Sequence, residues 1–145
     1  MNISLELLLA PILTLIIVQS IKLTTDGIKG NFNIKSILTA YGGMPSSHAA
    51  VVTSLSTMIA YHEGFWSAAF AIAAIFSAVV ITDAIVLRGF IQTHGKALDH
   101  LVKKLPESEQ KSLAFIPAKL RHTLPQVLVG IVIGFAIATI IKLFF

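Results

Sequence analysis

The chain has 145 residues, of which 55% are hydrophobic and 12% are charged, and its mean hydropathy is +0.84. A typical soluble domain is roughly 25% charged, so the composition argues against a soluble domain and indicates a single membrane-embedded domain over residues 1–145. The chain contains no cysteine, which excludes disulfides, a thiolate nucleophile and a cysteine zinc site. Its net charge of +4 accompanies so apolar a composition that we expect a bilayer as partner and not nucleic acid.

Apolar segments predict an all-α integral membrane bundle of about four transmembrane helices, since a span needs about 20 mostly apolar residues. In chain order they cover Leu5–Leu23, Ser47–Tyr61, Phe65–Leu87 and Val127–Phe145. The second segment reaches only about 22 Å at 1.5 Å per residue. Its Ser, Thr and Ala residues suit packing inside a bundle, and a re-entrant or interfacial helix is the alternative.

An amphipathic helix is predicted after the third segment, and we expect it to lie at the membrane interface. Pro106 ends it. In the last segment, Gly130 and Gly134 have the spacing of a helix-packing motif. The apolar face of the amphipathic helix comprises Phe90, Leu98, Leu101, Val102 and Leu105, with Lys96, Lys103 and Lys104 opposite.

Positive residues gather in two of the connecting regions, and such residues are in excess in cytoplasmic loops. The connection at 62–64 has none, and the C-terminal segment has only Lys142. We therefore predict a multi-pass protein of the cell membrane, with both termini outside and both charged regions in the cytoplasm. These regions contain Lys22, Lys29, Lys35, Arg88, Lys96, Lys103, Lys104, Lys111, Lys119 and Arg121.

Two imidazoles and a guanidinium are candidates for phosphate chemistry at that face. His48 follows a Pro-Ser-Ser turn before the second segment, and Arg88 and His94 stand six positions apart after the third. Histidine can attack phosphorus or protonate a leaving oxygen, and arginine presents a planar fork to phosphate oxygens. Ser46 and Ser47, with the amides that start the second helix, would form an anion cradle, although either serine can also be an N-cap.

Two further ionisable residues lie within apolar segments. Lys22 would supply a second positive charge to a phosphate, or would extend to the membrane surface as a structural lysine. Asp83 lies where a charged side chain is costly and normally faces a polar interior, so we expect it to pair with Arg88 or Lys22. The other histidines are His62, which we expect to be an interfacial or packing residue, and His100 and His122, whose roles the sequence leaves open.

With these residues in view, the chain resembles the divergent branch of the type 2 phosphatidic acid phosphatase (PAP2) superfamily, which is related to acid phosphatases and vanadium-dependent haloperoxidases. That superfamily uses a lysine motif, a Pro-Ser-Gly-His motif and a Ser-Arg-x5-His-x3-Asp motif. The resemblance covers most of the chain. It includes Gln19-x-x-Lys22, Gly43-Met44-Pro45-Ser46-Ser47-His48, Asp83-Ala84, Arg88, His94 and His122-Thr123.

The resemblance implies a role for each matching residue. His94 would be the nucleophile that forms a phosphohistidine, and His48 would be the general acid. No metal or other cofactor is implied. The phosphate ligands would be Lys22, Arg88 and Ser46, to which we add Ser47 from the cradle.

The chain departs from the superfamily pattern in the third motif. Leu87 replaces its serine, and Leu98 stands where an aspartate would orient His94. Asp99 comes one position late, about 100° further round a helix, so we name Asp83 as the group that would orient the nucleophile. About four spans, where the superfamily usually has six, indicate a reduced PAP2-like fold.

These observations predict a metal-independent membrane lipid phosphatase with its site facing the cytoplasm. Its substrate would be a lipid phosphomonoester such as phosphatidylglycerophosphate or phosphatidate, or a pyrophosphate such as polyprenyl pyrophosphate. One alternative is a non-catalytic lipid-phosphate binding or transport protein that retains the anion pocket, and another is a structural or assembly subunit. A thin bundle would bury its polar groups better as a homodimer, which we also expect.

Overall fold

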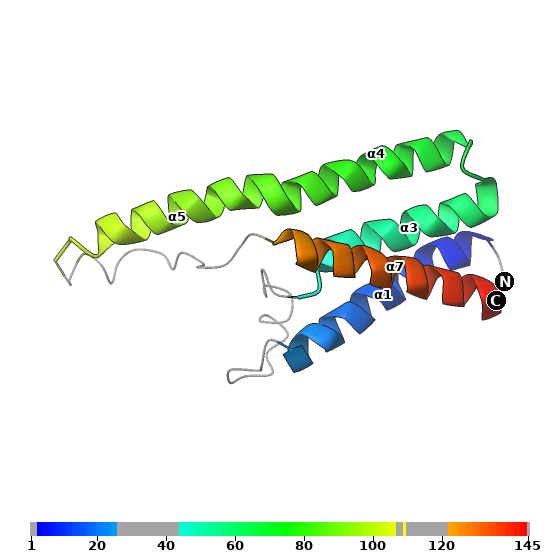
Figure 1. The fold of residues 1–145 in the computed structure, drawn as a ribbon, viewed down its shortest axis with the longest axis horizontal. Coiled ribbons are helices and arrows are strands. Elements are labelled where there is room, and N and C mark those ends of the chain that lie inside the picture. The colour runs from blue at the N-terminus through cyan, green and yellow to red at the C-terminus, as the bar shows by residue number, and fades with distance from the viewer. Residues whose placement is uncertain (1–2, 26–43, 107–108, 110–121, 145) are drawn as a thin grey trace.

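The structure is a computed structural model that describes residues 3–25, 44–106, 109 and 122–144. The secondary structure in these ranges is helical, as the composition and the apolar segments predict. Figure 1 shows α1, α3 and α7 packed together, with α4 alongside α3 and both chain ends at one end of the bundle. The elements are α1 (Ile3–Thr25), α3 (Ser47–Glu63), α4 (Ala68–Thr82), the π-helical turn η1 (Asp83–Leu87), α5 (Arg88–Val102) and α7 (Leu124–Phe144).

Three of the described helical stretches are long and apolar enough to cross a membrane: Leu5–Lys22, Ala68–Val102 and Leu124–Phe144. They correspond to the first, third and fourth predicted segments. The second segment forms α3, which has 17 residues and contacts α1, α4 and α7. Helix α3 is therefore the central helix of the bundle, which explains why its sequence is rich in small and hydroxylated residues.

The third segment continues into the amphipathic helix without a break. The combined stretch Ala68–Val102 has 35 residues, about 52 Å at 1.5 Å per residue, whereas the hydrocarbon core is about 30 Å thick. The turn η1 joins the two parts, because the Arg88 N–H donates to the carbonyl oxygen of Asp83, five residues earlier. As a result, α5 extends well beyond the other helices (Figure 1).

Helix α7 lies against the backbone of α3 through two glycines. A Cβ added at Gly130 would collide with the carbonyl oxygen of Ser46, and one added at Gly134 would collide with that of Ala50. Only residues without a side chain allow this approach, and such contacts hold helices together where lipid removes the hydrophobic driving force. The predicted packing role of the two glycines is confirmed.

Hydroxyl groups link α3 to its other neighbours. Thr14 Oγ1 on α1 donates to Ser54 Oγ at 3.0 Å, and both residues are fully buried. On the opposite side, Ser56 Oγ lies 2.8 Å from Ser77 Oγ of α4. A hydroxyl left without a partner in an apolar interior would be costly, so these pairs determine which helix faces meet.

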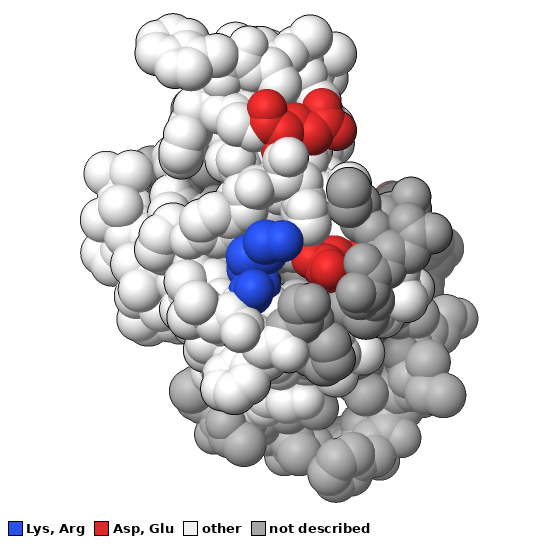
Figure 2. Space-filling model, turned by 90° about the vertical axis from the view of Figure 1, so that its right-hand side faces the viewer, with Lys and Arg blue, Asp and Glu red and all other residues white. Residues whose placement is uncertain are grey.

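The end of the bundle that holds the termini contains a buried ionic cluster. His62 Nε2 lies 2.8 Å from Glu6 Oε2, and the two side chains are 6% and 3% exposed. Lys142 Nζ lies 3.6 Å from the same oxygen. Figure 2 views this end, where a basic group lies beside an acidic one on a surface of few charges. His62 therefore does more than pack at an interface, because its contact with Glu6 joins α3 to the start of α1, and Glu6 in turn contacts Lys142 at the end of α7.

We predict that Gly134→Val destabilises the bundle by about 1–3 kcal/mol, the usual cost of overpacking a close contact. The added side chain would push α7 away from the Ala50 carbonyl. The measurement is unfolding in mixed detergent micelles, followed by circular dichroism. Ala136→Val is the matched control, because Ala136 lies on the exposed face of the same helix. Equal stability of the two variants would contradict the prediction.

We predict that Glu6→Ala lowers the free energy of unfolding by about 1–3 kcal/mol, because it leaves the buried ring of His62 without its partner. Lys142 also contacts Glu6, but it is 36% exposed and can still reach water. The loss of this second contact should therefore add little to the destabilisation. The same micelle assay measures the effect. Glu63→Ala, an exposed carboxylate at the end of α3, serves as control and should change stability by less than about 0.5 kcal/mol.

Candidate functional site

The predicted phosphate-chemistry segments lie at the end of the bundle opposite the termini (Figure 1). Helix α1 ends there, α3 and α7 begin there, and η1 passes beside them. The Pro-Ser-Ser-His turn and Arg88 therefore do meet at one end, as an even number of spans between them requires. Gly42 and Gly43, which precede this turn in the sequence, lie outside the described residues, as do Lys29, Lys35, Lys111, Lys119 and Arg121.

Ser46 begins α3 and anchors it to α7. Its Oγ accepts a hydrogen bond from the Ala49 N–H at 3.5 Å, which makes Ser46 the N-cap. Its own N–H donates to the carbonyl oxygen of Gln126 at 2.9 Å. Ser46 is fully buried and Ser47 is 5% exposed. The capping role is thus observed, and the hydroxyl lies at a helix N-terminus, where amide groups and the dipole favour an anion.

His48 contacts the predicted guanidinium directly. Arg88 Nη2 donates to His48 Nε2 at 3.1 Å. Because a guanidinium can only donate, Nε2 must accept, and His48 is neutral with its proton on Nδ1. Within the described part of the chain, this Nδ1 and Ser47 Oγ are buried and have no hydrogen-bond partner. Two polar groups at the start of α3 are thus available to a ligand.

Asp83 positions Arg88. Arg88 Nε donates to Asp83 Oδ2 at 3.2 Å, so of the two predicted partners the carboxylate pairs with Arg88. In a regular α-helix, residues five apart are about 140° apart round the axis. The wider turn of η1 brings the two side chains onto one side of the helix, which fits the frequent occurrence of such turns at functional sites.

Lys22 belongs to the same group of charges. It lies in the last turn of α1 and is 7% exposed. Its charge, like that of Arg88, lies close enough to act on the ring of His48. The end of α1 therefore brings a second cation to the site, as the resemblance to the lysine motif implies.

The second imidazole at the site is His122, whose role the sequence left open. It is 1% exposed, and its ring centroid lies 6.3 Å from that of His48. Its backbone N–H donates to the carbonyl oxygen of Ala84 at 3.2 Å. This bond holds the segment before α7 against η1, so His122 lies between the elements that carry His48 and Arg88.

Gln126 orients the His122 ring. Its Oε1 accepts from the Thr123 N–H at 2.9 Å, which fixes the orientation of the amide. The same oxygen lies 3.4 Å from His122 Nδ1, so Nδ1 donates, and in a neutral ring Nε2 carries the lone pair. A sequence signal for this arrangement existed. His122-x3-Gln126 has the His-x3-Asp spacing of the superfamily, with an amide in place of the carboxylate.

His94, the predicted nucleophile, is not brought to this group. It lies six residues after Arg88 on α5, which corresponds to about 9 Å along the axis and 240° round it. Its side chain is exposed and makes no hydrogen bond, ion pair or ring contact with the described residues. Asp99 pairs with Lys103 at 2.7 Å, and Asp83 with Arg88, so neither carboxylate orients His94. The separation follows from α5 continuing α4 as one helix.

Comparisons with known proteins identify the family of the chain. The model of the family described as "Divergent PAP2 family" matches residues 3–137. An "Uncharacterized membrane protein YuiD" of Bacillus subtilis (strain 168) is 37% identical over 95 residues, which cover 66% of this chain and 60% of that relative. No solved structure matches the chain. Because the family model covers nearly the whole sequence, and the helices are of membrane-spanning length, this chain is a multi-pass membrane protein that belongs to the Divergent PAP2 family.

Proposed function

We propose that this protein is a membrane lipid phosphatase that hydrolyses a lipid phosphomonoester or pyrophosphate. The observation that carries the proposal is the group of His48, Arg88 and His122 at one end of the bundle. With Lys22 it contains two cations for phosphate oxygens and two imidazoles near enough for one phosphate to contact both rings. Positioned nucleophile, acid and cations are what phosphate-ester cleavage needs.

In the mechanism we propose, Arg88 and Lys22 bind the phosphate oxygens, together with the amides at the start of α3. His122 Nε2 attacks phosphorus, and the bond from phosphorus to the lipid oxygen breaks. Arg88 turns to the phosphate and leaves His48 Nε2 able to take up a proton, which His48 passes to the leaving oxygen. His48 then accepts a proton from the water that attacks the phosphohistidine, and inorganic phosphate is released.

This mechanism assigns the nucleophile to His122, whereas the resemblance implies His94. Two observations favour His122. It is buried beside His48, and Gln126 holds its Nδ1 so that Nε2 carries the lone pair. His94 is exposed and would need α5 to move before it could reach a phosphate held by Arg88.

The orientation that we propose places the site at the cytoplasmic face of the cell membrane, with both termini outside. Among the described residues, the cations at or beyond the site end are Lys22, Arg88, Lys96, Lys103 and Lys104, and only Lys142 lies at the other end. This asymmetry fits the excess of positive residues in cytoplasmic regions. A phosphomonoester made at that face, such as phosphatidylglycerophosphate, would have direct access to the site.

A lipid-phosphate binding or transport protein is the second candidate, and Gln126 is the observation that favours it. A carboxylate at this position would stabilise a positively charged His122 during phosphoryl transfer, whereas a neutral amide only orients the ring. A binder needs the cations of the site but does not need a nucleophile. Catalysis and binding are therefore tested separately.

We predict that His122→Ala, His48→Ala and Arg88→Ala each lower phosphate release from lipid phosphates by at least about 10²-fold, the usual contribution of a positioned acid or base. His94→Ala should retain most of the activity. The assay measures inorganic phosphate from phosphatidylglycerophosphate, phosphatidate and polyprenyl pyrophosphate in detergent micelles. If His94→Ala lost activity and His122→Ala did not, the nucleophile would be His94 and not His122. Equal rates of phosphate release in wild type and all variants would contradict the proposal that the protein is a phosphatase.

We predict that Arg88→Lys weakens the binding of vanadate, a tetrahedral phosphate analogue, by at least about tenfold, because lysine cannot reproduce the fork that contacts His48 and Asp83. Titration calorimetry on the purified protein measures the affinity. Lys96→Arg, an exposed change on α5, is the control and should have no effect. Tight vanadate binding by the wild-type protein, without any phosphate release from lipid phosphates, would favour a lipid-phosphate binding or transport protein.

A further inference from the structure

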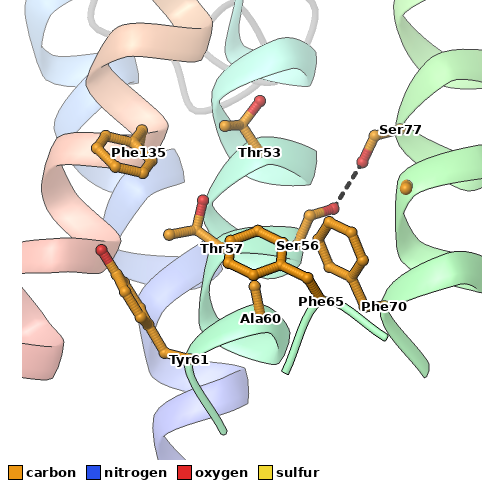
Figure 3. Close-up of a pocket in the computed structure, with 10 residues that line it drawn as sticks. Thr53, Ser56, Thr57, Ala60, Tyr61, Phe65, Phe70, Ser77 and Phe135 are labelled. Atoms are coloured by element: carbon orange, nitrogen blue, oxygen red, sulfur yellow. Dashed lines mark hydrogen bonds between the residues drawn. The ribbon is translucent and has the colours of Figure 1, made fainter. Parts of the chain in front are cut away.

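A lateral groove lies along α3 from Thr53 to Tyr61, on the side where α4 and α7 flank α3. Its volume is about 370 Å³. Figure 3 shows α3 as its floor, with Phe70 and Ser77 of α4 on one side and Phe135 of α7 on the other. The lining residues are Thr53, Ser56, Thr57, Ala60, Tyr61, Phe65, Phe70, Ala74, Ser77 and Phe135.

The polar groups of the groove bond mostly to one another and to the backbone. Ser77 Oγ lies 2.8 Å from Ser56 Oγ and donates to the Ala73 carbonyl at the same distance. Tyr61 Oη lies 3.0 Å from Thr139 Oγ1. A ligand therefore meets mainly methyl groups and aromatic rings, and these favour hydrocarbon over a polar headgroup.

The length and volume of the groove limit the size of its occupant. Along α3 the lining runs from Thr53 to Tyr61, about 12 Å at 1.5 Å per residue. An apolar groove of this length and volume fits one extended hydrocarbon chain.

Along α3, the groove begins close to the phosphate site. Thr53 is five residues from His48 on α3, about 8 Å along the axis. A lipid whose phosphate lies beside His48 would therefore extend about 8 Å along α3 before its hydrocarbon chain reaches the groove.

We infer that the groove binds one hydrocarbon chain of the lipid whose phosphate occupies the His48–His122 site. This inference rests on the proposed phosphatase function and narrows its substrate class to lipids with a long acyl or prenyl chain. In this arrangement, the His48–His122 site binds the headgroup phosphate, and the groove along α3 recognises the length of the chain. Short-chain phosphates should therefore be poor substrates even though their phosphate is identical.

The first test fills the groove and compares substrates. Ala74→Phe and Thr57→Phe should each lower kcat/KM for dioleoyl phosphatidate by at least about tenfold, because chain burial contributes in proportion to the apolar area. Both should leave the rate on dihexanoyl phosphatidate unchanged. Ala78→Phe, on the exposed face of α4, is the matched control and should affect neither substrate. An equal effect on long and short chains would overturn the inference.

The second test does not depend on turnover. A phosphatidate carrying a diazirine in its acyl chain is photolysed with the protein in phosphatidylcholine vesicles, and the labelled residues are mapped by mass spectrometry. Label is expected on Phe70 and Phe135 in wild type and in His122→Ala, and should be lost in Ala74→Phe. Phosphate release without this label would overturn the inference that the groove binds the acyl chain, and the proposed phosphatase function would stand. Labelling without any phosphate release would support chain binding in the groove and overturn the proposed phosphatase function.

Discussion

The close backbone contact between α3 and α7 is the constraint on which the site depends. In a bilayer, apolar side chains gain little by leaving lipid for protein, so helices associate through close packing and hydrogen bonds. Gly130 and Gly134 let α7 rest on the carbonyl groups of α3. This contact aligns the starts of the two helices, and His122, just before α7, comes to lie beside His48. The same packing faces Phe135 toward the groove along α3.

The two ends of the bundle differ in how far their charged side chains are paired. At the end with the termini, Glu6 contacts Lys142 and His62, so the ionic groups there satisfy one another and tie three helices together. At the other end, Asp83 pairs with Arg88, and Lys22 is buried nearby, so these three residues together carry a net positive charge. Charges held out of water at such a site favour an anionic ligand, whether it is turned over or only bound.

Predictions from the sequence succeeded where local pattern determines structure. The apolar segments, the packing glycines and the pairing of Asp83 with Arg88 all follow from short-range spacing or burial cost. His94 was expected at the site because its spacing from Arg88 was taken from a motif and not from a helix, and in the structure its side chain is exposed on α5. Once α4, η1 and α5 form one helix, that spacing turns His94 away. The spacing from His122 to Gln126, by contrast, lies within one turn and survives folding.

By itself, the sequence determined that the chain is a helical membrane protein and that its cations gather with a Pro-Ser-Ser-His turn at one end of the bundle. It could do so because hydropathy, helix length and span parity depend on residues close in the chain. Only the tertiary structure decided which histidine joins His48 and where a lipid chain could lie. His122 is 74 residues from His48 by number, and the groove combines three helices, so both depend on how distant segments pack and not on any local pattern.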